Sequence, residues 1–510
     1  MTGNGNASQL WPKIRDALVD DPLTYPQKFL PVDFIEQEIT EEAIKNELRR
    51  KWSLSNRALP GRIISEDARK VFTILVHIGE PAAIKDLLAE GLNDGHLPLR
   101  VSPTGRNDNT LVSHDERKTF TSFSRWKTEQ RVTDFVDKQW LVLAPVFDST
   151  GRHLKLESSC PLPFKAMEEV KGDYSSVVRK SEFHPAHYIG PEGVQVAVKE
   201  FRFPNDFERE KANLDTVQTL ENRQNIITHL ATFERGKKHY AVFPWADGGS
   251  LRDFWENQNG ESRAPELALW SLQQMLNLAS ALQSLHGVNF RHGDIKPDNI
   301  LHFPDSKGLG KLVIADVGVS RSHVDKTMMR HVGTTTRATT PSYEAPETVI
   351  NHQAPRSRRY DVWSLGCIYL EFVIWFLHDV DALSSLGRAR HAPYFEFYLQ
   401  DPETKQATIH PIVSDAIDRL REDERCVGGT ALEALINLVA RHLLQIDVES
   451  RDDVEQVVAK MKHIVQQAEA NPQYLFNSGM EEQPKMRFLE RAQTGAPDHA
   501  HPSNPEKQET

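Results

Sequence analysis

Apolar side chains recur every three or four residues between positions 65 and 91, as they do on one face of an α-helix. Gly79 and Pro81 interrupt this pattern once, and Gly91 ends it. Glycine just past a helix and proline at its first position are common boundary signals. The pattern therefore predicts two helices joined by a short turn, with Ser65 as the candidate N-cap of the first.

Downstream, the periodicity changes along the chain. Short apolar runs at residues 139–147, 176–178 and 194–198 predict β-strands. Helical periodicity dominates after residue 265, as at residues 267–285 and 362–377. A strand-rich part followed by a helix-rich part predicts an α+β protein with two lobes.

These patterns divide the chain into three parts. We expect a helical N-terminal extension at residues 1–135, in which the polar stretch 102–118 is a mobile loop. The two-lobed domain is expected at residues 136–470. Residues 471–510 are expected to be largely disordered, because residues 493–510 contain several prolines and no large aliphatic or aromatic side chain.

The composition of the 510-residue chain is that of a folded protein. Hydrophobic residues make up 39% and charged residues 26%, which is too balanced for a wholly disordered chain. The formal net charge is -11, so the composition gives no indication of the basic surface that a nucleic-acid-binding protein needs. We therefore expect no nucleic-acid partner.

The cysteines and the apolar runs exclude further classes of protein. The three cysteines are far apart and form no Cys-x-x-Cys pair, which argues against a disulfide framework and a zinc site. The N-terminus lacks the apolar stretch of a secretory signal. The most apolar run, residues 367–377, is too short to cross a bilayer and contains Glu371, so it predicts a buried helix. We expect a cytoplasmic or nuclear protein without a membrane partner.

The segment HGDIKPDNIL, residues 292–301, carries the strongest chemical signal. Its carboxylate, Asp294, is followed five residues later by the amide of Asn299. A phosphoryl-transfer site needs such a pair if one turn both orients an attacking hydroxyl and holds a metal ion. Lys296 adds a cation where negative charge develops on the transferring group.

Three further residues fit the same chemistry. Asp316 follows an apolar strand and precedes a glycine, where its carboxylate can bridge magnesium to phosphates. Lys199 ends the strand at residues 196–198, and Glu210 follows eleven residues later on a helical pattern. This spacing lets an ion pair hold the lysine against phosphate.

Together these residues resemble the eukaryotic protein kinase family over residues 161–468. The resemblance implies a bilobal kinase fold, with a small antiparallel β-rich lobe and a large α-helical lobe, that uses ATP and Mg²⁺. It implies catalytic roles for Asp294, Lys296, Lys199 and Glu210, and magnesium binding by Asn299 and Asp316. The implied nucleotide-binding residues are Gly172, Val177, Ala197, Lys199, Phe243, Ala246 and Leu301, with Phe243 as gatekeeper and residues 244–246 as the hinge.

The resemblance extends to the large lobe. Residues 345–347 (APE) match the end of the activation segment, and residues 361–366 match the central helix of that lobe. Arg451 is expected to pair with Glu347.

The phosphate-binding loop departs from the family pattern. Its three glycine positions are occupied here by Val170, Gly172 and Ser175, so only the middle glycine is kept. Loss of two glycines reduces the freedom of the backbone to approach phosphates. We expect a lower ATP affinity or turnover, although Tyr174 can still fold over the phosphates.

Two departures lie near the catalytic loop. Gly293 replaces the arginine that usually binds a phosphate on the activation segment, which argues against activation through phosphorylation of residues 334–336. Val317 replaces the usual phenylalanine after Asp316 and weakens one packing contact. These features, with the helical extension, resemble divergent fungal kinase-like proteins.

The favoured function is transfer of the ATP γ-phosphoryl group to Ser or Thr hydroxyls of proteins, because Lys296 and Thr340 resemble the serine/threonine branch. A pseudokinase that acts as a nucleotide-binding scaffold is the alternative, motivated by the degenerate loop. A small-molecule kinase is a weaker third hypothesis. His184 and His187 have a spacing found in metal sites, but their Pro- and Gly-rich surroundings favour a loop.

Overall fold

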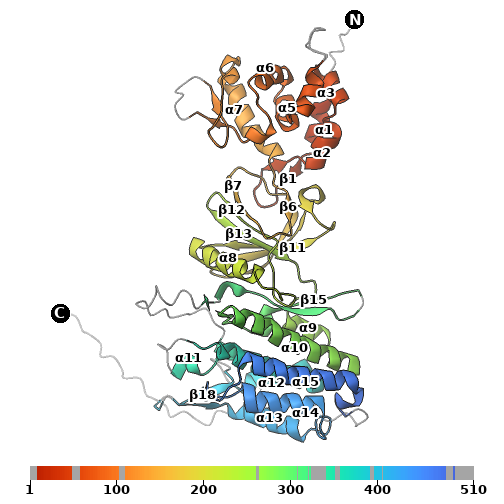
Figure 1. Ribbon diagram of the computed structural model, residues 1–510, viewed down its shortest axis with the longest axis vertical. Helices are drawn as coiled ribbons and strands as arrows, with labels where there is room; N and C mark the ends of the chain where they lie inside the picture. Colours follow the sequence, from red (N-terminus) through yellow and green to blue (C-terminus); the bar gives the residue numbers. More distant parts are fainter. Residues whose placement is uncertain are drawn as a thin grey trace, which may run out of the picture. The chain divides into compact units, whose positions relative to one another are not determined.

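The computed structural model describes residues 9–48, 58–102, 109–259, 264–306, 308–319, 321–322, 341–350, 356–390, 396–401, 403–404, 406–477 and 486–488. The chain splits into two compact units. The first comprises residues 1–212 and 228–245, and the second comprises residues 213–227 and 246–510. Figure 1 shows the elements of both units.

The first unit begins with a helical subdomain, drawn in red to orange in Figure 1. Its α-helices are α1 (Leu10–Asp16), α2 (Val32–Glu38), α3 (Glu41–Leu48), α4 (Leu59–Ser65), α5 (Arg69–His77), α6 (Ile84–Ala89) and α7 (Glu129–Lys138). Its short strands are β1 (Val19–Asp20), β2 (Lys28–Phe29), β3 (Arg100–Val101), β4 (Leu111–Val112) and β5 (Thr119–Phe120). Helix α5 is the most enclosed of these helices, because every residue from 71 to 76 is buried.

The predicted helix pair is present as α5 and α6. The 3₁₀-helix η2 (Pro81–Ala83) leads directly into α6. Gly79 and Gly91 have φ values of 80° and 74°, a left-handed conformation that glycine adopts readily at helix ends.

The predicted cap of α5 was wrong. Ser65 is the last residue of α4. The N-terminus of α5 is capped instead by the distant Asp94, whose carboxylate accepts hydrogen bonds at 2.9 Å from the backbone N–H groups of Lys70 and Val71. A carboxylate from another turn satisfies the same free N–H groups that a local cap would.

Two further predictions in this region require correction. Residues 139–142 form a 3₁₀-helix, η5, and only Phe147–Asp148 at the end of the predicted strand forms a strand, β6. Val142 is buried in the core of the helical subdomain, and a short apolar run does not distinguish a strand from a buried helical turn. The expected loop at residues 102–118 contains β4, which pairs with β3 and β5; residues 103–108 lie outside the described residues.

A six-stranded sheet forms the rest of the first unit, in the order β7-β12-β13-β11-β9-β8. The strands are β7 (His153–Leu156), β8 (Phe164–Gly172), β9 (Ser176–Phe183), β11 (Gln195–Phe201), β12 (Ala231–Arg235) and β13 (Lys238–Pro244). All neighbours are antiparallel except β7 and β12, which are parallel. β6 pairs in parallel with β10 (Tyr188–Ile189), and helix α8 (Pro204–Gln218) follows β11.

The second unit is mainly helical. Its helices are α9 (Leu251–Asn257), α10 (Pro265–Gly287), α11 (Glu347–Ile350), α12 (Arg359–Ala389), α13 (Pro411–Glu422), α14 (Ala431–Leu438), the π-helix η11 (Val439–Leu443) and α15 (Val454–Ala470). Its short strands are β14 (Phe290–Arg291), β15 (Ile300–Phe303), β16 (Lys311–Ile314), β17 (Arg321–Ser322), β18 (Tyr398–Gln400) and β19 (Ala407–Ile409). α10 and α12 include the two long helices that the periodicity predicted.

Helix α12 is the one helix among the described residues that is long and apolar enough to cross a membrane. Its most apolar window is 94% buried within the protein, as in the core helix of a globular domain. The prediction of a buried helix at residues 367–377 is confirmed, since Cys367 and Leu370 are at most 1% exposed.

Part of the C-terminal segment packs on the second unit. Leu475 follows the 3₁₀-helix η12 (Pro472–Tyr474) and is 2% exposed. Phe488 is 6% exposed, and its backbone N–H donates to Ser385 Oγ at 2.7 Å. The expectation of a largely disordered tail from residue 471 does not hold for these residues.

Candidate functional site

The catalytic-loop motif lies between β14 and β15. Residues 292–296 leave β14 as an extended loop, and the 3₁₀-helix η7 (Pro297–Asn299) leads into β15. Pro297 at the first position of η7 fits the preference of proline for a helix start. β15 pairs with β16 in an antiparallel ladder, which places the residues before Asp316 beside the residues after Asn299.

Three predicted catalytic side chains meet within this loop. Lys296 Nζ donates to Asp294 Oδ2 at 2.8 Å. Asn299 Nδ2 donates to the same carboxylate oxygen and to the backbone carbonyl of Asp294, both at 2.9 Å. Asp294 and Asn299 are buried, at 8% and 4% exposure. The two donors orient the carboxylate of Asp294, as expected of a group that must receive a hydroxyl proton in a defined direction.

The loop backbone is held by a carboxylate on α12. Asp361 is fully buried, and its oxygens accept hydrogen bonds from His286 Nε2 and from the backbone N–H groups of His292 and Gly293, at 2.8–2.9 Å. Burial raises the pKa of the Asp361 carboxyl, but the hydrogen bond and charge of His286 outweigh it, so the pKa lies below its usual value. Asp361 therefore stays ionised and holds the loop.

The departure at Gly293 has a conformational basis. Its φ is 85°, in the left-handed region where a side chain is strained. Glycine adopts this conformation easily, so the loop keeps its hydrogen bond to Asp361 without the arginine of the family pattern. Residues 334–336 and Thr340, which concern the activation segment, lie outside the described residues.

The predicted magnesium residue Asp316 has a strained backbone. Its φ is 63°, which is uncommon for a residue with a side chain and is often found at functional sites. The preceding residue, Ala315, donates its N–H to Asn299 O at 2.8 Å and accepts from His292 Nε2 at 3.0 Å. The catalytic loop thus holds the backbone that presents Asp316. Val317 is 1% exposed, so the smaller side chain is still packed.

The predicted lysine–glutamate pair is present in the first unit. Lys199 Nζ lies 2.8 and 2.7 Å from the two carboxylate oxygens of Glu210, so the pair is bidentate. Lys199 comes from β11 and Glu210 from α8, and their side chains are only 15% and 5% exposed. A charge pair with this burial needs good geometry to offset the cost of desolvation. The pair fixes the lysine where it can meet an anion.

The predicted nucleotide-binding residues are distributed over both units. In the sheet, Ala197 lies directly opposite Phe243, and Val177 lies opposite Gly172. In the second unit, Leu301 forms an isolated bridge with Ser250, and Ala246 is 8% exposed. Gly172 ends β8, and an added Cβ there would lie 3.2 Å from Oε1 of the exposed Glu169 side chain.

Asp173, at the tip of the phosphate-binding loop, was not predicted from the sequence. Its Oδ1 accepts the backbone N–H groups of Ser175 and Ser176, both at 2.7 Å, and the Ser175 hydroxyl at 2.8 Å. Burial raises the pKa of the Asp173 carboxyl, but these hydrogen bonds and the charge of Lys199 bring it below its usual value. The preference of Asp for bonding backbone N–H groups two residues on was the available signal.

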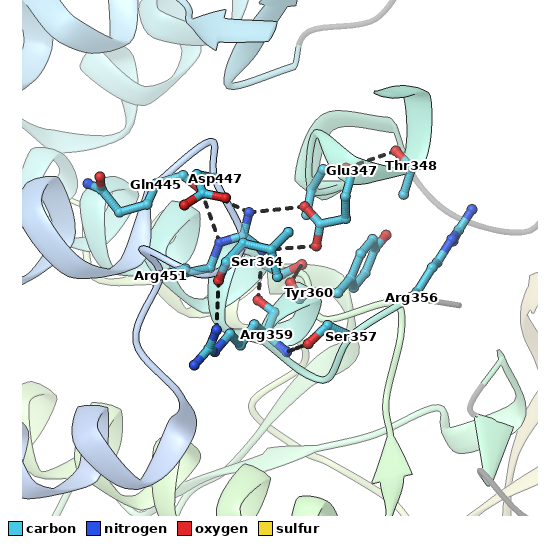
Figure 2. Close-up of polar contacts among 12 residues, drawn as sticks. Glu347, Thr348, Arg356, Ser357, Arg359, Tyr360, Ser364, Gln445, Asp447 and Arg451 are labelled. Atoms are coloured by element: carbon cyan, nitrogen blue, oxygen red, sulfur yellow. Dashed lines mark hydrogen bonds and ion pairs between the residues drawn. The ribbon is translucent and has the colours of Figure 1, made fainter. Parts of the chain in front are cut away.

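A second predicted ion pair stabilises the large helical unit. Arg451 donates to both carboxylate oxygens of Glu347 at 2.9 and 3.0 Å, and Figure 2 shows the two groups face to face. The Arg451 side chain is fully buried and also donates to the carbonyls of Gln445 and Arg359. The predicted pairing of these residues is confirmed.

The histidines at residues 184 and 187 contact backbone and aromatic groups of the protein. His187 Nε2 accepts the backbone N–H of Val32 at 3.2 Å, and its Nδ1 lies 3.0 Å from the carbonyl of Pro145. Phe29 packs edge-on against both histidine rings. The described residues contain no cluster of three or more His, Cys, Asp or Glu side chains that could hold a metal ion. The histidines thus join the helical subdomain to the sheet.

The donor set at the proposed metal position fits magnesium. Asn299 and Asp316 offer an amide oxygen and a carboxylate, and Mg²⁺ usually takes one or two such protein ligands together with phosphate oxygens and water. The strained backbone at Asp316 is the structural observation that accords with such a role.

Comparison with known proteins identifies relatives of the chain. The protein kinase domain family matches residues 186–460. The chain is 26% identical over 338 residues to the serine/threonine-protein kinase BCK1/SLK1/SSP31 of Saccharomyces cerevisiae, covering 61% of this chain and 21% of the yeast protein. It is 31% identical over 164 residues to myosin light chain kinase A of Dictyostelium discoideum, covering 32% of this chain and 51% of that protein.

A third relative is the serine/threonine-protein kinase Sgk1 of Rattus norvegicus, which is 34% identical over 143 residues, covering 28% of this chain and 30% of that protein. The chain therefore spans only part of the length of these relatives. The family match covers more than half of the chain and includes the Lys199–Glu210 pair, the catalytic loop and Asp316. The chain belongs to the protein kinase domain family.

Proposed function

We propose that this protein is a bilobal serine/threonine protein kinase with a helical N-terminal extension, which transfers the γ-phosphoryl group of ATP to Ser or Thr hydroxyls of proteins. ATP with Mg²⁺ supplies the phosphoryl group and the leaving ADP. The observation that carries the proposal is the arrangement of Asp294, whose carboxylate is oriented by Lys296 and Asn299.

Each side chain has a defined task in this reaction. Asp294 accepts a hydrogen bond from the substrate hydroxyl and takes its proton as the hydroxyl oxygen bonds to phosphorus. Lys296 stabilises negative charge on the transferring group. Lys199, held by Glu210, binds the α- and β-phosphates. Asn299 and Asp316 would hold the magnesium ion that accompanies ATP.

A protein substrate is favoured over a small molecule by the segment that ends at Glu347. Tyr343 and Glu347 are both anchored, the first by donation to Glu371 at 2.9 Å and the second by Arg451. This segment resembles the surface on which kinases of the family bind extended peptides. We further propose that the protein acts in the cytoplasm or nucleus, without a nucleic-acid or membrane partner.

The test is transfer of labelled γ-phosphate from Mg-ATP by the purified chain, to itself and to a generic basic protein. Lys199→Met and Asp294→Asn proteins serve as controls. Incorporation on Ser or Thr that both controls lose would support the kinase. Absence of transfer, with thermal stability that still rises on addition of Mg-ATP, would overturn it in favour of a pseudokinase scaffold.

A further inference from the structure

Strand β7 is an edge strand of the six-stranded sheet, and it is supplied by the segment that follows the helical subdomain. It pairs in parallel with β12, and it lies outside residues 186–460, which match the kinase family. Successive side chains of a strand point to opposite faces. Leu154 and Leu156 pack against the sheet's hydrophobic core, so His153 and Lys155 point to the other face.

His153 contacts helix α8 on that face. Its ring lies 6.0 Å, between centroids, from the ring of Phe207, which is fully buried. Two residues of the sheet, Phe201 and His239, also have rings near that of Phe207, at centroid distances of 5.5 and 4.9 Å. His153 is itself fixed, because its Nδ1 lies 3.0 Å from Thr232 Oγ1 and its Nε2 lies 3.2 Å from Glu234 Oε1.

Phe207 and Glu210 are three residues apart on α8, so their side chains occupy neighbouring positions on one face of the helix. A shift of α8 that separates Phe207 from His153 would also move Glu210 relative to Lys199. The pair depends on two bonds of 2.7 and 2.8 Å, and such a geometry tolerates little displacement.

The helical subdomain anchors the segment that carries β7. Asp21 accepts the backbone N–H of Leu162 at 3.1 Å and lies 3.5 Å from the buried Arg235, at the end of β12. Arg235 also donates to the side chains of Thr24 and Gln27. The subdomain therefore holds the segment that follows β7 and the end of β12, the strand that pairs with β7.

We propose that β7 is a built-in positioning element for the catalytic ion pair, in which His153 supports α8 through Phe207 and thereby keeps Glu210 on Lys199. This assignment gives the N-terminal extension a role in catalysis that does not require contact with substrate. It rests on the proposed kinase function. His153 is a positioning residue, since it reaches the reacting groups only through α8.

The test is a double-mutant cycle in the full-length protein, with the phosphotransfer rate and the affinity for Mg-ATP as readouts. His153→Ala should lower kcat/KM for ATP about tenfold, within the range of coupling between contacting side chains. His153→Phe keeps an aromatic ring against Phe207 and should restore most of the loss. Lys155→Ala, on the same face of β7 but exposed, should match the parent.

The cycle with Glu210→Gln distinguishes positioning from general destabilisation. When Glu210 no longer pairs with Lys199, His153→Ala should cause little additional loss. An equal loss in both backgrounds, or no loss in the parent, would overturn the proposal. If the parent transfers no phosphate, the proposed function fails. The role of His153 is then decided by the affinity for Mg-ATP of the parent, His153→Ala, Glu210→Gln and the double variant, in which the two substitutions should again be non-additive.

Discussion

The catalytic loop and the phosphate-binding loop differ in how they are held. The catalytic loop is enclosed: Asp361 accepts hydrogen bonds from its backbone, and Lys296 and Asn299 donate hydrogen bonds to its functional carboxylate. The phosphate-binding loop is open, and Tyr174 near its tip is 83% exposed. Its backbone N–H groups at residues 175 and 176 bond to a side chain of the same loop, Asp173.

This difference indicates where sequence drift is tolerated in the molecule. A buried network loses a full hydrogen bond and leaves a polar group unsatisfied when one member changes. An exposed turn exchanges its bonds with water at little cost. Among the departures from the family pattern, Gly293 keeps the network, and Val170 and Ser175 fall in the open loop. Val317 is buried, and it replaces one apolar side chain by a smaller one.

The largest effect is expected for Asp294→Asn, which tests the functional carboxylate of the catalytic loop. The variant keeps the size of the side chain but cannot accept the hydroxyl proton, so kcat should fall by about 10²–10⁴-fold, the usual contribution of general base catalysis. The affinity for Mg-ATP should stay within about twofold of the parent, because uniform nucleotide binding does not depend on this proton transfer. Steady-state kinetics and calorimetric ATP binding measure the two quantities. Activity equal to that of the parent would refute the role of Asp294.

Arg451→Met tests the framework of the helical unit. The substitution leaves Glu347 without its cation, and breaking a buried pair costs about 3–5 kcal/mol in the free energy of unfolding. Glu449→Gln is the matched control, because Glu449 pairs with Arg359 while its own side chain is 86% exposed. The control should lose less than about 1 kcal/mol. Similar losses in the two variants, measured by denaturant unfolding, would show that burial of the pair is unimportant.

Acid should affect His187, which joins the helical subdomain to the sheet, and the catalytic loop in different pH ranges. Burial lowers the pKa of His187 to about 4, so the native state favours neutral histidine. The resulting stability is present above the ordinary histidine pKa of about 6.5 and is lost as the pH falls towards 4, by about 3 kcal/mol at most. Asp361, whose pKa is lowered, keeps its contribution until the pH falls below the usual carboxyl range.

The measurement is the unfolding free energy of the parent and of His187→Gln between pH 7 and pH 4. Glutamine can still accept the N–H of Val32 but does not titrate, so the variant should lose less stability than the parent as the pH falls. Identical pH dependence in the two proteins would show that His187 does not cause the loss of stability in acid.

The smallest effect is expected at Asp173. Asp173→Ser removes a negative charge close to Lys199 and frees loop N–H groups, so the KM for ATP should fall about threefold to tenfold. Glu169→Gln, on the neighbouring strand β8, removes one charge without touching these N–H groups and serves as the control. An unchanged or higher KM in Asp173→Ser would mean that the carboxylate supports the loop in the nucleotide-bound state.

Much of the site was readable from the sequence because its signals are local. The catalytic loop brings Asp294, Lys296 and Asn299 together within one turn, so their spacing already implied contact. The ion pairs Lys199–Glu210 and Glu347–Arg451 followed from the family resemblance. The apolar run at residues 139–147 was misread, because a short run has no period long enough to separate a strand from a helical turn.

The sequence by itself determined the family, the order of the functional residues and the long helices, since each rests on local spacing or on hydrophobic periodicity. The tertiary structure alone decided which distant segments meet: Asp94 on the N-terminus of α5, Asp21 on Arg235, and His153 on Phe207. A single carboxylate or imidazole carries no periodic signal, and its partner is selected only when packing brings two surfaces together.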